Sequence, residues 1–260
     1  LAGLVGLAAL LTVLTLVFIV GYILIKGIPN LTPELFQLEY NSENVSMFPA
    51  IINTICMTVL SLLIAGPLGI LAAVYLVEYA KKGNKLVSLV RVTAETLTGI
   101  PSIVYGLFGM LFFVTTLHWG YSMLAGAFTL AIMVLPVIMR TTEEALLSVP
   151  DTFREASFGL GAGRLRTIFV VILPSAVPGI FSGVILSIGR IVGETAALMY
   201  TAGTVAELPK SVMSSTRTLS VHMYSLASEG LYVDQAYATA VVLLLIVLII
   251  NWIDRKSTRL

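Results

Sequence analysis

The longest uncharged stretch of the chain, from Thr96 to Met139, limits what this sequence can fold into more than any other feature. As one helix rising 1.5 Å per residue, it would extend about 66 Å. The hydrocarbon core of a bilayer is about 30 Å thick, so the stretch is long enough to cross a membrane twice. The cluster His118-Trp119-Gly120-Tyr121 near its middle supplies aromatic side chains suited to an interface, and we expect the chain to turn there.

Composition places the rest of the chain in lipid as well. Of its 260 residues, 58% are hydrophobic and 11% are charged, whereas soluble domains carry about 25% charged residues. The uncharged runs predict an all-α membrane protein with six transmembrane helices in a single transmembrane domain, residues 1–260. The first run is too long for a signal peptide, so we expect it to be retained as a span. The predicted spans are residues 1–25, 48–78, 88–117, 122–148, 167–201 and 236–253.

The charged residues, the cysteine and the histidines of the chain argue against several classes of function. A net charge of +1, with no basic stripe, argues against nucleic-acid binding. The single cysteine, Cys56, allows no intrachain disulfide and no zinc spacing, and we expect it to be a small core residue. His118 and His222 lack nearby partner ligands and are predicted to be surface residues. We therefore expect no metal site, no cofactor bound by this chain and no catalytic residue.

The basic residues favour one orientation, because short cytoplasmic loops retain Lys and Arg. With both termini in the cytoplasm, the bases outside are Lys26, Lys210 and Arg217. The larger cytoplasmic set is Lys81, Lys82, Lys85, Arg91, Arg154, Arg164, Arg166, Arg255, Lys256 and Arg259. This bias predicts a multi-pass membrane protein with both termini in the cytoplasm.

The predicted cytoplasmic loop at residues 150–166 has its own pattern. Pro150-Asp151 favours a helix start, Phe153, Ala156 and Leu160 share one face, and alternating glycines end the segment. The pattern predicts a helix of about two turns. On these residues alone, the favoured interpretation is an ordinary amphipathic connector on the membrane surface.

Specific residues in this loop resemble the EAA loop of ABC importer permeases. They are Glu155-Ala156-Ser157, then Gly161 four residues after Ser157, and Leu173-Pro174 further on. The family usually has a second alanine and an isoleucine where this chain has Ser157 and Val171. The resemblance implies a type I ABC importer permease architecture, in which the short helix docks into a groove on a separate ATPase subunit.

The same resemblance assigns roles to individual loop residues. Glu155 would be the charged contact to the ATPase, and Arg154, Ala156 and Gly161 would belong to the same coupling loop. The glycines lack GxGxxG spacing, no strand precedes them and no GxxxxGK[ST] sequence occurs in the chain. ATP is therefore expected to be used by a partner subunit, and the chain itself is not expected to be an enzyme.

Arg190 and Glu194 lie one helical turn apart in apolar surroundings. A charge at the centre of a membrane helix costs about 2.5 to 3.5 kcal/mol, so such groups usually serve a function. Alternatively, the two side chains reach the outer membrane surface, or they only neutralise each other's charge. Arg140 near the end of the fourth span is also explained by the orientation bias. Gly99-Ile100-Pro101 interrupts the third span, either as a simple kink or as a break that frees backbone donors.

The segments from Arg190 to Gly203 and from Gly99 to Phe108 resemble the phosphate-specific (Pst) branch of the family, most like the PstA type. The resemblance implies that Arg190 and Glu194 take part in the passage of phosphate, and Arg140 similarly matches a second arginine. A guanidinium suits phosphate because its planar fork donates two parallel bonds.

The resemblance also implies partners: a second, PstC-like permease, two PstB-like ATPase subunits and an extracytoplasmic PstS-like phosphate-binding protein. Other classes stay open at this point. The chain could be the permease of a sulfate or molybdate importer, an ion-coupled secondary carrier that needs no ATPase, or a helical membrane scaffold.

Overall fold

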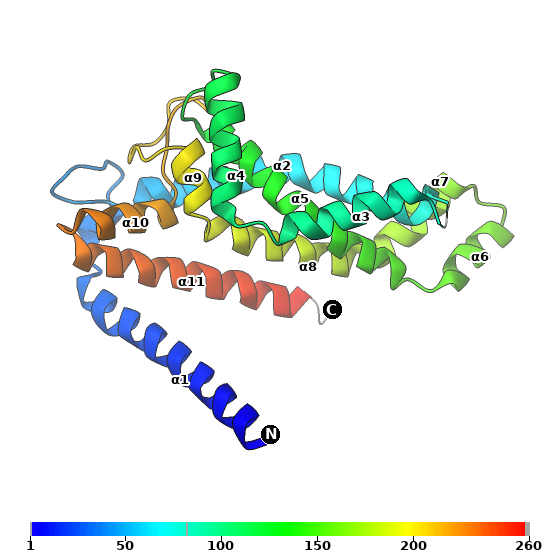
Figure 1. Cartoon of the computed structure of the whole chain (residues 1–260), viewed down its shortest axis with the longest axis horizontal. Helices are drawn as coiled ribbons and strands as arrows, with labels where there is room; N and C mark the ends of the chain where they lie inside the picture. The colour runs from blue at the N-terminus through cyan, green and yellow to red at the C-terminus, as the bar shows by residue number, and fades with distance from the viewer. Residues whose placement is uncertain (1, 82, 258–260) are drawn as a thin grey trace.

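The computed structural model describes residues 2–81 and 83–257, and within these residues every regular element is a helix. Four long helices, α2, α3, α5 and α8, run along the long axis of the molecule (Figure 1). α11 lies beside α8. α1 contacts α11, and its N-terminal part points away from the bundle (Figure 1). The all-α prediction is confirmed.

The α-helices are α1 (Ala2–Gly27), α2 (Phe48–Val74), α3 (Lys85–Thr98), α4 (Ser102–Gly109), α5 (Met123–Leu147), α6 (Asp151–Gly159), α7 (Arg164–Thr167), α8 (Leu173–Val192), α9 (Ala196–Thr201), α10 (Leu219–Glu229) and α11 (Val233–Ser257). Two short 3-10 helices follow α1, namely η1 (Ile28–Asn30) and η2 (Pro33–Phe36). Three π-helical segments continue longer helices: η3 (Tyr75–Tyr79), η4 (Met110–Thr116) and η5 (Ile168–Ile172).

Five of the described helices are long and apolar enough to cross a bilayer. They cover Gly3–Asn30, Phe48–Tyr79, Met123–Leu147, Arg164–Val192 and Val233–Ile253. A sixth crossing is obtained only when α3 and the helix from α4 through η4 are counted together. The prediction of six spans therefore depends on this broken pair.

The third predicted span, residues 88–117, is not one continuous helix. The chain bends by 103° between α3 and α4, at Gly99-Ile100-Pro101. Proline has no N–H to donate and disfavours a helical conformation in the preceding residue, so α3 cannot continue through it. Tyr105 on α4 donates its hydroxyl to the carbonyl of Leu97 at 2.8 Å, which satisfies one of the carbonyls left free where α3 ends.

The fifth predicted span, residues 167–201, is also interrupted. The helix that begins at α7 ends at Val192, and α9 starts only after a three-residue break. Glu194 lies in this break, and its Oε1 accepts a hydrogen bond of 3.0 Å from the amide of Ala197. A side-chain acceptor at this place satisfies one of the free amides of the new helix, so the break is stabilised locally.

The main core lies where α5 packs between α2 and α8. Small residues allow the close approach: a Cβ at Gly69 of α2 would be 2.9 Å from the Cγ2 of Ile138 on α5. The central buried side chains are Met57, Leu130, Met133, Ile138, Ile191 and Leu198. Cys56, predicted to be a core residue, is instead exposed on α2.

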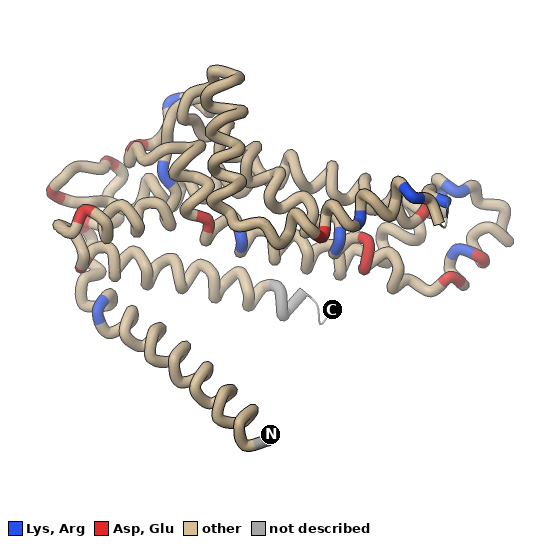
Figure 2. Tube along the Cα trace, viewed as in Figure 1, with Lys and Arg blue, Asp and Glu red and all other residues tan. Residues whose placement is uncertain are grey.

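The bundle has two distinct ends, which we name the α6 end and the α10 end after the helices found there (Figure 1). Most Lys and Arg residues gather toward the α6 end (Figure 2). α1 and α11 both extend from the α10 end back toward the opposite side (Figure 1). Charge and topology therefore distinguish the two ends.

Candidate functional site: a junction of two broken helices and an anchored connecting helix

The helices that follow the two breaks pack together although they are far apart in the sequence. α4, which follows the first break, packs against α9, which follows the second (Figure 1). Gly106 makes this contact possible, because a Cβ there would lie 2.8 Å from the Cα of Ala197. We refer to α4, α9 and the two breaks beside them as the junction.

Arg190 and Glu194 lie on the two sides of the second break. Arg190 is in the last turn of α8 and is partly buried, whereas Glu194 follows the helix end and is 8% exposed. The backbone carbonyl of Glu194 accepts a 2.5 Å hydrogen bond from the Ser220 hydroxyl on α10. Glu194 thus connects three elements: α8, α9 and α10.

The sequence predicted Arg190 and Glu194 as neighbours on one helix, and this geometry is wrong. Among the described residues the two form no ion pair, because the helix ends between them and the carboxylate caps α9. Helix ends inside a membrane protein expose backbone groups and charges to an internal path. A guanidinium without a carboxylate partner is chemically available to an anion at such a place.

Arg140 lies in a different environment, toward the α6 end. Its guanidinium is 3.1 Å from Glu144 on its own helix and 3.5 Å from Glu95 on α3, and its side chain is 55% exposed. A second pair joins α3 to α5 through Arg91 and Glu143 at 2.5 Å. These five side chains line one cavity of about 310 Å³, and Arg190 is not among its lining residues.

Helix α6 matches the prediction closely in position and length. It spans Asp151–Gly159, and the chain turns after it at Gly161, whose φ of +80° favours glycine. Glu155 and Ala156 are exposed, as are the apolar side chains of Phe153 and Leu160, the latter 90% exposed. An apolar face that this chain leaves uncovered, with a carboxylate beside it, is suited to contact another protein.

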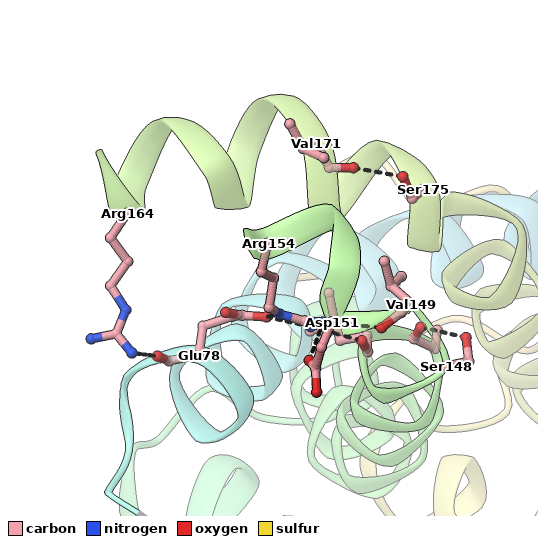
Figure 3. Close-up of polar contacts among 10 residues, drawn as sticks. Glu78, Ser148, Val149, Asp151, Arg154, Arg164, Val171 and Ser175 are labelled. Atoms are coloured by element: carbon pink, nitrogen blue, oxygen red, sulfur yellow. Dashed lines mark hydrogen bonds and ion pairs between the residues drawn. The ribbon is translucent and has the colours of Figure 1, made fainter. Parts of the chain in front are cut away.

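Arg154 does not share that exposed face. Its guanidinium points into the molecule and binds Glu78 at the end of α2, with 2.7 Å between Nη2 and Oε1 (Figure 3). The prediction that Arg154 belongs to the coupling loop stays untested, but this side chain is directed toward its own chain. Sequence reasoning missed Glu78 because it lies 76 residues earlier in the chain.

His222 was predicted to be a surface residue, and this is wrong. It lies on α10 with no exposed surface, beside the Tyr40 ring at 6.2 Å between ring centroids. Burial, together with the positive charge of Arg217, lowers the pKa of His222 to about 3. No cluster of three or more potential metal ligands occurs among the described residues.

Apolar crossing helices, two interrupted helices whose continuations α4 and α9 pack together and an exposed connecting helix are features of a polytopic membrane permease. The chain belongs to the family described as binding-protein-dependent transport system inner membrane component, which matches residues 65–259.

Relatives extend the similarity over most of the chain. The probable ABC transporter permease protein YqgI of Bacillus subtilis is 35% identical over 267 residues, covering 96% of this chain and 90% of its own. The phosphate transport system permease protein PstA of Pasteurella multocida is 37% identical over 240 residues, covering 91% and 85%.

Solved structures show the same fold. An inward-facing MetNI methionine ABC transporter has a TM-score of 0.63 at 21% identity, over 82% of this chain and 93% of that one. A bacterial alginate ABC transporter has a TM-score of 0.63 at 22% identity, over 98% and 96%. The predicted type I importer permease architecture is confirmed.

Proposed function

We propose that this chain is one of two permease subunits through which inorganic phosphate enters the cytoplasm by alternating access. The observation that carries the proposal is the 37% identity to a phosphate transport permease over 91% of the chain. The shared region includes the part of the chain that forms the junction. A second permease subunit, similar to PstC, would complete the path.

In this proposal the α6 end faces the cytoplasm and both termini are cytoplasmic, in a prokaryotic inner membrane. The gathering of Lys and Arg at this end supports the orientation (Figure 2). The α1–α2 connection, which carries Glu34, Glu39 and Glu43, would face outward, on the side from which an extracytoplasmic binding protein similar to PstS would deliver phosphate.

Two ATPase subunits, similar to PstB, would bind α6 from the cytoplasm and use ATP, so that this chain binds no cofactor. Phe153, Ala156 and Leu160 would enter the groove of the ATPase, with Glu155 as the charged contact. These side chains are exposed in this chain, and a helix that lays an apolar face into a groove is a common recognition mode. Gly161 would let the chain turn back to the membrane.

Arg190 would hold phosphate during passage, with Glu194 shaping the break beside it. The support is geometric: Arg190 has no carboxylate partner among the described residues, whereas Glu194 is engaged as the cap of α9. Arg140, held by Glu95 and Glu144, would act on phosphate later, near the cytoplasmic exit. A charged residue inside a bundle usually marks the path of an ion.

The test is reconstitution into liposomes with candidate partner subunits and binding protein, followed by uptake of labelled phosphate. We expect uptake that requires ATP and is not reduced by excess sulfate or molybdate. Competition by sulfate would instead assign the chain to another oxyanion importer, and uptake without an ATPase would assign it to the ion-coupled carriers.

A further inference from the structure

The side chain of Arg154 uses its full donor capacity within its own chain. An arginine has five N–H donors. Nε donates to Glu78 at 3.1 Å, and Nη1 donates to the Val149 carbonyl at 3.0 Å and to Asp151 at 3.1 Å. Nη2 donates to Glu78 at 2.7 Å and to the Leu146 carbonyl at 3.1 Å (Figure 3). No donor remains for a partner protein, so Arg154 acts inside this chain.

The partner carboxylate belongs to α2, the helix that packs along α5 in the main core. Glu78 lies on η3, where α2 ends in a π-helical turn, and it is 9% exposed. The side chain of Arg154 is 15% exposed, so water screens this pair weakly. Charge-assisted bonds in such a setting are strong and directional. The pair therefore fixes the distance between α6 and the end of α2.

A second arginine connects the segment that follows α6 to Glu78 and to its neighbour Tyr79. Arg164, at the start of α7, donates through Nη2 to the backbone carbonyl of Glu78 (Figure 3). Its guanidinium also lies over the Tyr79 ring, 5.1 Å from the centroid, as in a cation–π contact. Glu78 thus receives contacts both from α6, through Arg154, and from α7, through Arg164.

The remaining connections of α6 explain why this tie is needed. The Ser157 hydroxyl contacts the Thr167 hydroxyl at 2.8 Å, which joins α6 to α7. α6 also packs against η5, whereas the chain enters and leaves α6 through Ser148-Val149-Pro150 and the glycine-containing segment 160–163, which are not helical. A flexible connection absorbs a displacement, whereas a helix fixed to its neighbours passes the displacement on.

We infer that the Glu78–Arg154 pair carries the movement of α6 into α2, and that these are positioning residues rather than contacts to the ATPase. The inference rests on the proposed function, because it takes ATPase movement to be the input at α6. From α2 the displacement reaches α5, through contacts such as that of Gly69 with Ile138. Movement of the ATPase would then drive the central helix of the bundle directly.

The experiment compares phosphate transported per ATP hydrolysed in the reconstituted complex for Glu78→Gln, Arg154→Gln and the double variant. We expect each single variant to lower this ratio about fivefold or more, the lower end of the range for coupled sites. The double variant should lose no more than the worse single variant, because both changes break one connection. Arg154→Lys, which keeps the charge, should retain more coupling than Arg154→Gln.

The matched control is Asp151→Asn, which neutralises the exposed carboxylate that Arg154 binds on its own helix and leaves the connection to Glu78. We expect a ratio near that of the wild type. Wild-type ratios in Glu78→Gln and Arg154→Gln, or additive losses in the double variant, would overturn the inference. Loss of ATPase assembly with an unchanged ratio in the remaining complexes would also overturn it. A wild-type complex that hydrolyses ATP but moves no phosphate would instead contradict the proposed function.

Discussion

Gly106→Ala tests whether the close approach of α4 to α9 maintains the junction. The added Cβ would lie 2.8 Å from the Cα of Ala197 and 3.3 Å from the carbonyl oxygens of Ala196 and Ala197. These are backbone atoms, so no side-chain rotation relieves the contact. Reaching an ordinary contact distance of 3.4 Å requires the two helices to separate by about 0.6 Å.

Inserting a methyl group into a packed interior costs about 1 to 3 kcal/mol. In a helix, however, alanine is favoured over glycine by about 1 kcal/mol, and this gain must be separated from the cost. Gly21→Ala provides the matched control, because Gly21 lies inside α1 and a Cβ there meets no atom within 4 Å. The stability difference between the two variants therefore isolates the effect of packing at the junction.

The assay is thermal unfolding in detergent, followed by circular dichroism, together with ATP-driven phosphate uptake at matched expression. We expect Gly106→Ala to unfold at a lower temperature than Gly21→Ala and to transport more slowly, because the displaced α4 disturbs the break beside Arg190. If the two variants are equal in both stability and uptake, the close contact between α4 and α9 is not required and this reasoning is refuted.

Three further predictions concern other parts of the chain. Glu155→Ala should weaken ATPase binding about tenfold while insertion is unchanged, because it removes a charged contact; normal ATPase binding measured by co-purification would reject this role. Single cysteines at Asn41 and Val205, in a Cys56→Ser background, should react with an impermeant maleimide added outside cells, and reaction only from the inside would reverse the proposed orientation. His222 should make stability pH-dependent. Its pKa of about 3 lies below the unfolded value of 6.5, so its contribution to stability is complete above pH 6.5 and is lost progressively as the pH falls from 6.5 toward 3. Chemical denaturation between pH 7 and 5 measures this, and a His222→Gln variant with the same pH dependence as the wild type would contradict it.

Local features were predicted well because they depend on neighbouring residues. The start of α6 follows from Pro150-Asp151, and its end follows from Gly161, whose positive φ is a local requirement. The first two spans follow from uncharged length, and the fourth follows from uncharged length together with the turn expected at His118-Trp119-Gly120-Tyr121. These signals do not need knowledge of what packs against the segment.

The breaks were recognised less completely. Gly99-Ile100-Pro101 signals an interruption, but the size of the bend depends on what the next helix packs against. Here α4 packs on α9, and the bend reaches 103°. In the second break Arg190 and Glu194 fit helical spacing, and only Gly193 between them hints that α8 ends there. Hydropathy predicts the length of an apolar segment, but it does not predict whether the helix bends or ends within that segment.

Contacts between distant segments could not be predicted from one sequence. Glu78 and Arg154 are separated by 76 residues, and the charge of each has a simpler explanation as part of a cytoplasmic loop. His222 belongs to a segment of mixed polarity that suggested an exposed loop, yet α10 packs against α11 and buries it. In these cases tertiary packing decides the environment of the side chain.

The central claim is that phosphate passes the junction by binding Arg190, and ATP-driven uptake of labelled phosphate by Arg190→Gln tests it most directly. Wild type, Arg190→Gln and Arg190→Lys would be compared in the reconstituted complex at equal amounts of inserted protein and with normal ATPase assembly. The account predicts that Arg190→Gln abolishes uptake and that Arg190→Lys restores only part of it, because a lysine keeps the charge but lacks the planar fork. Wild-type rates of phosphate uptake in Arg190→Gln would contradict the account.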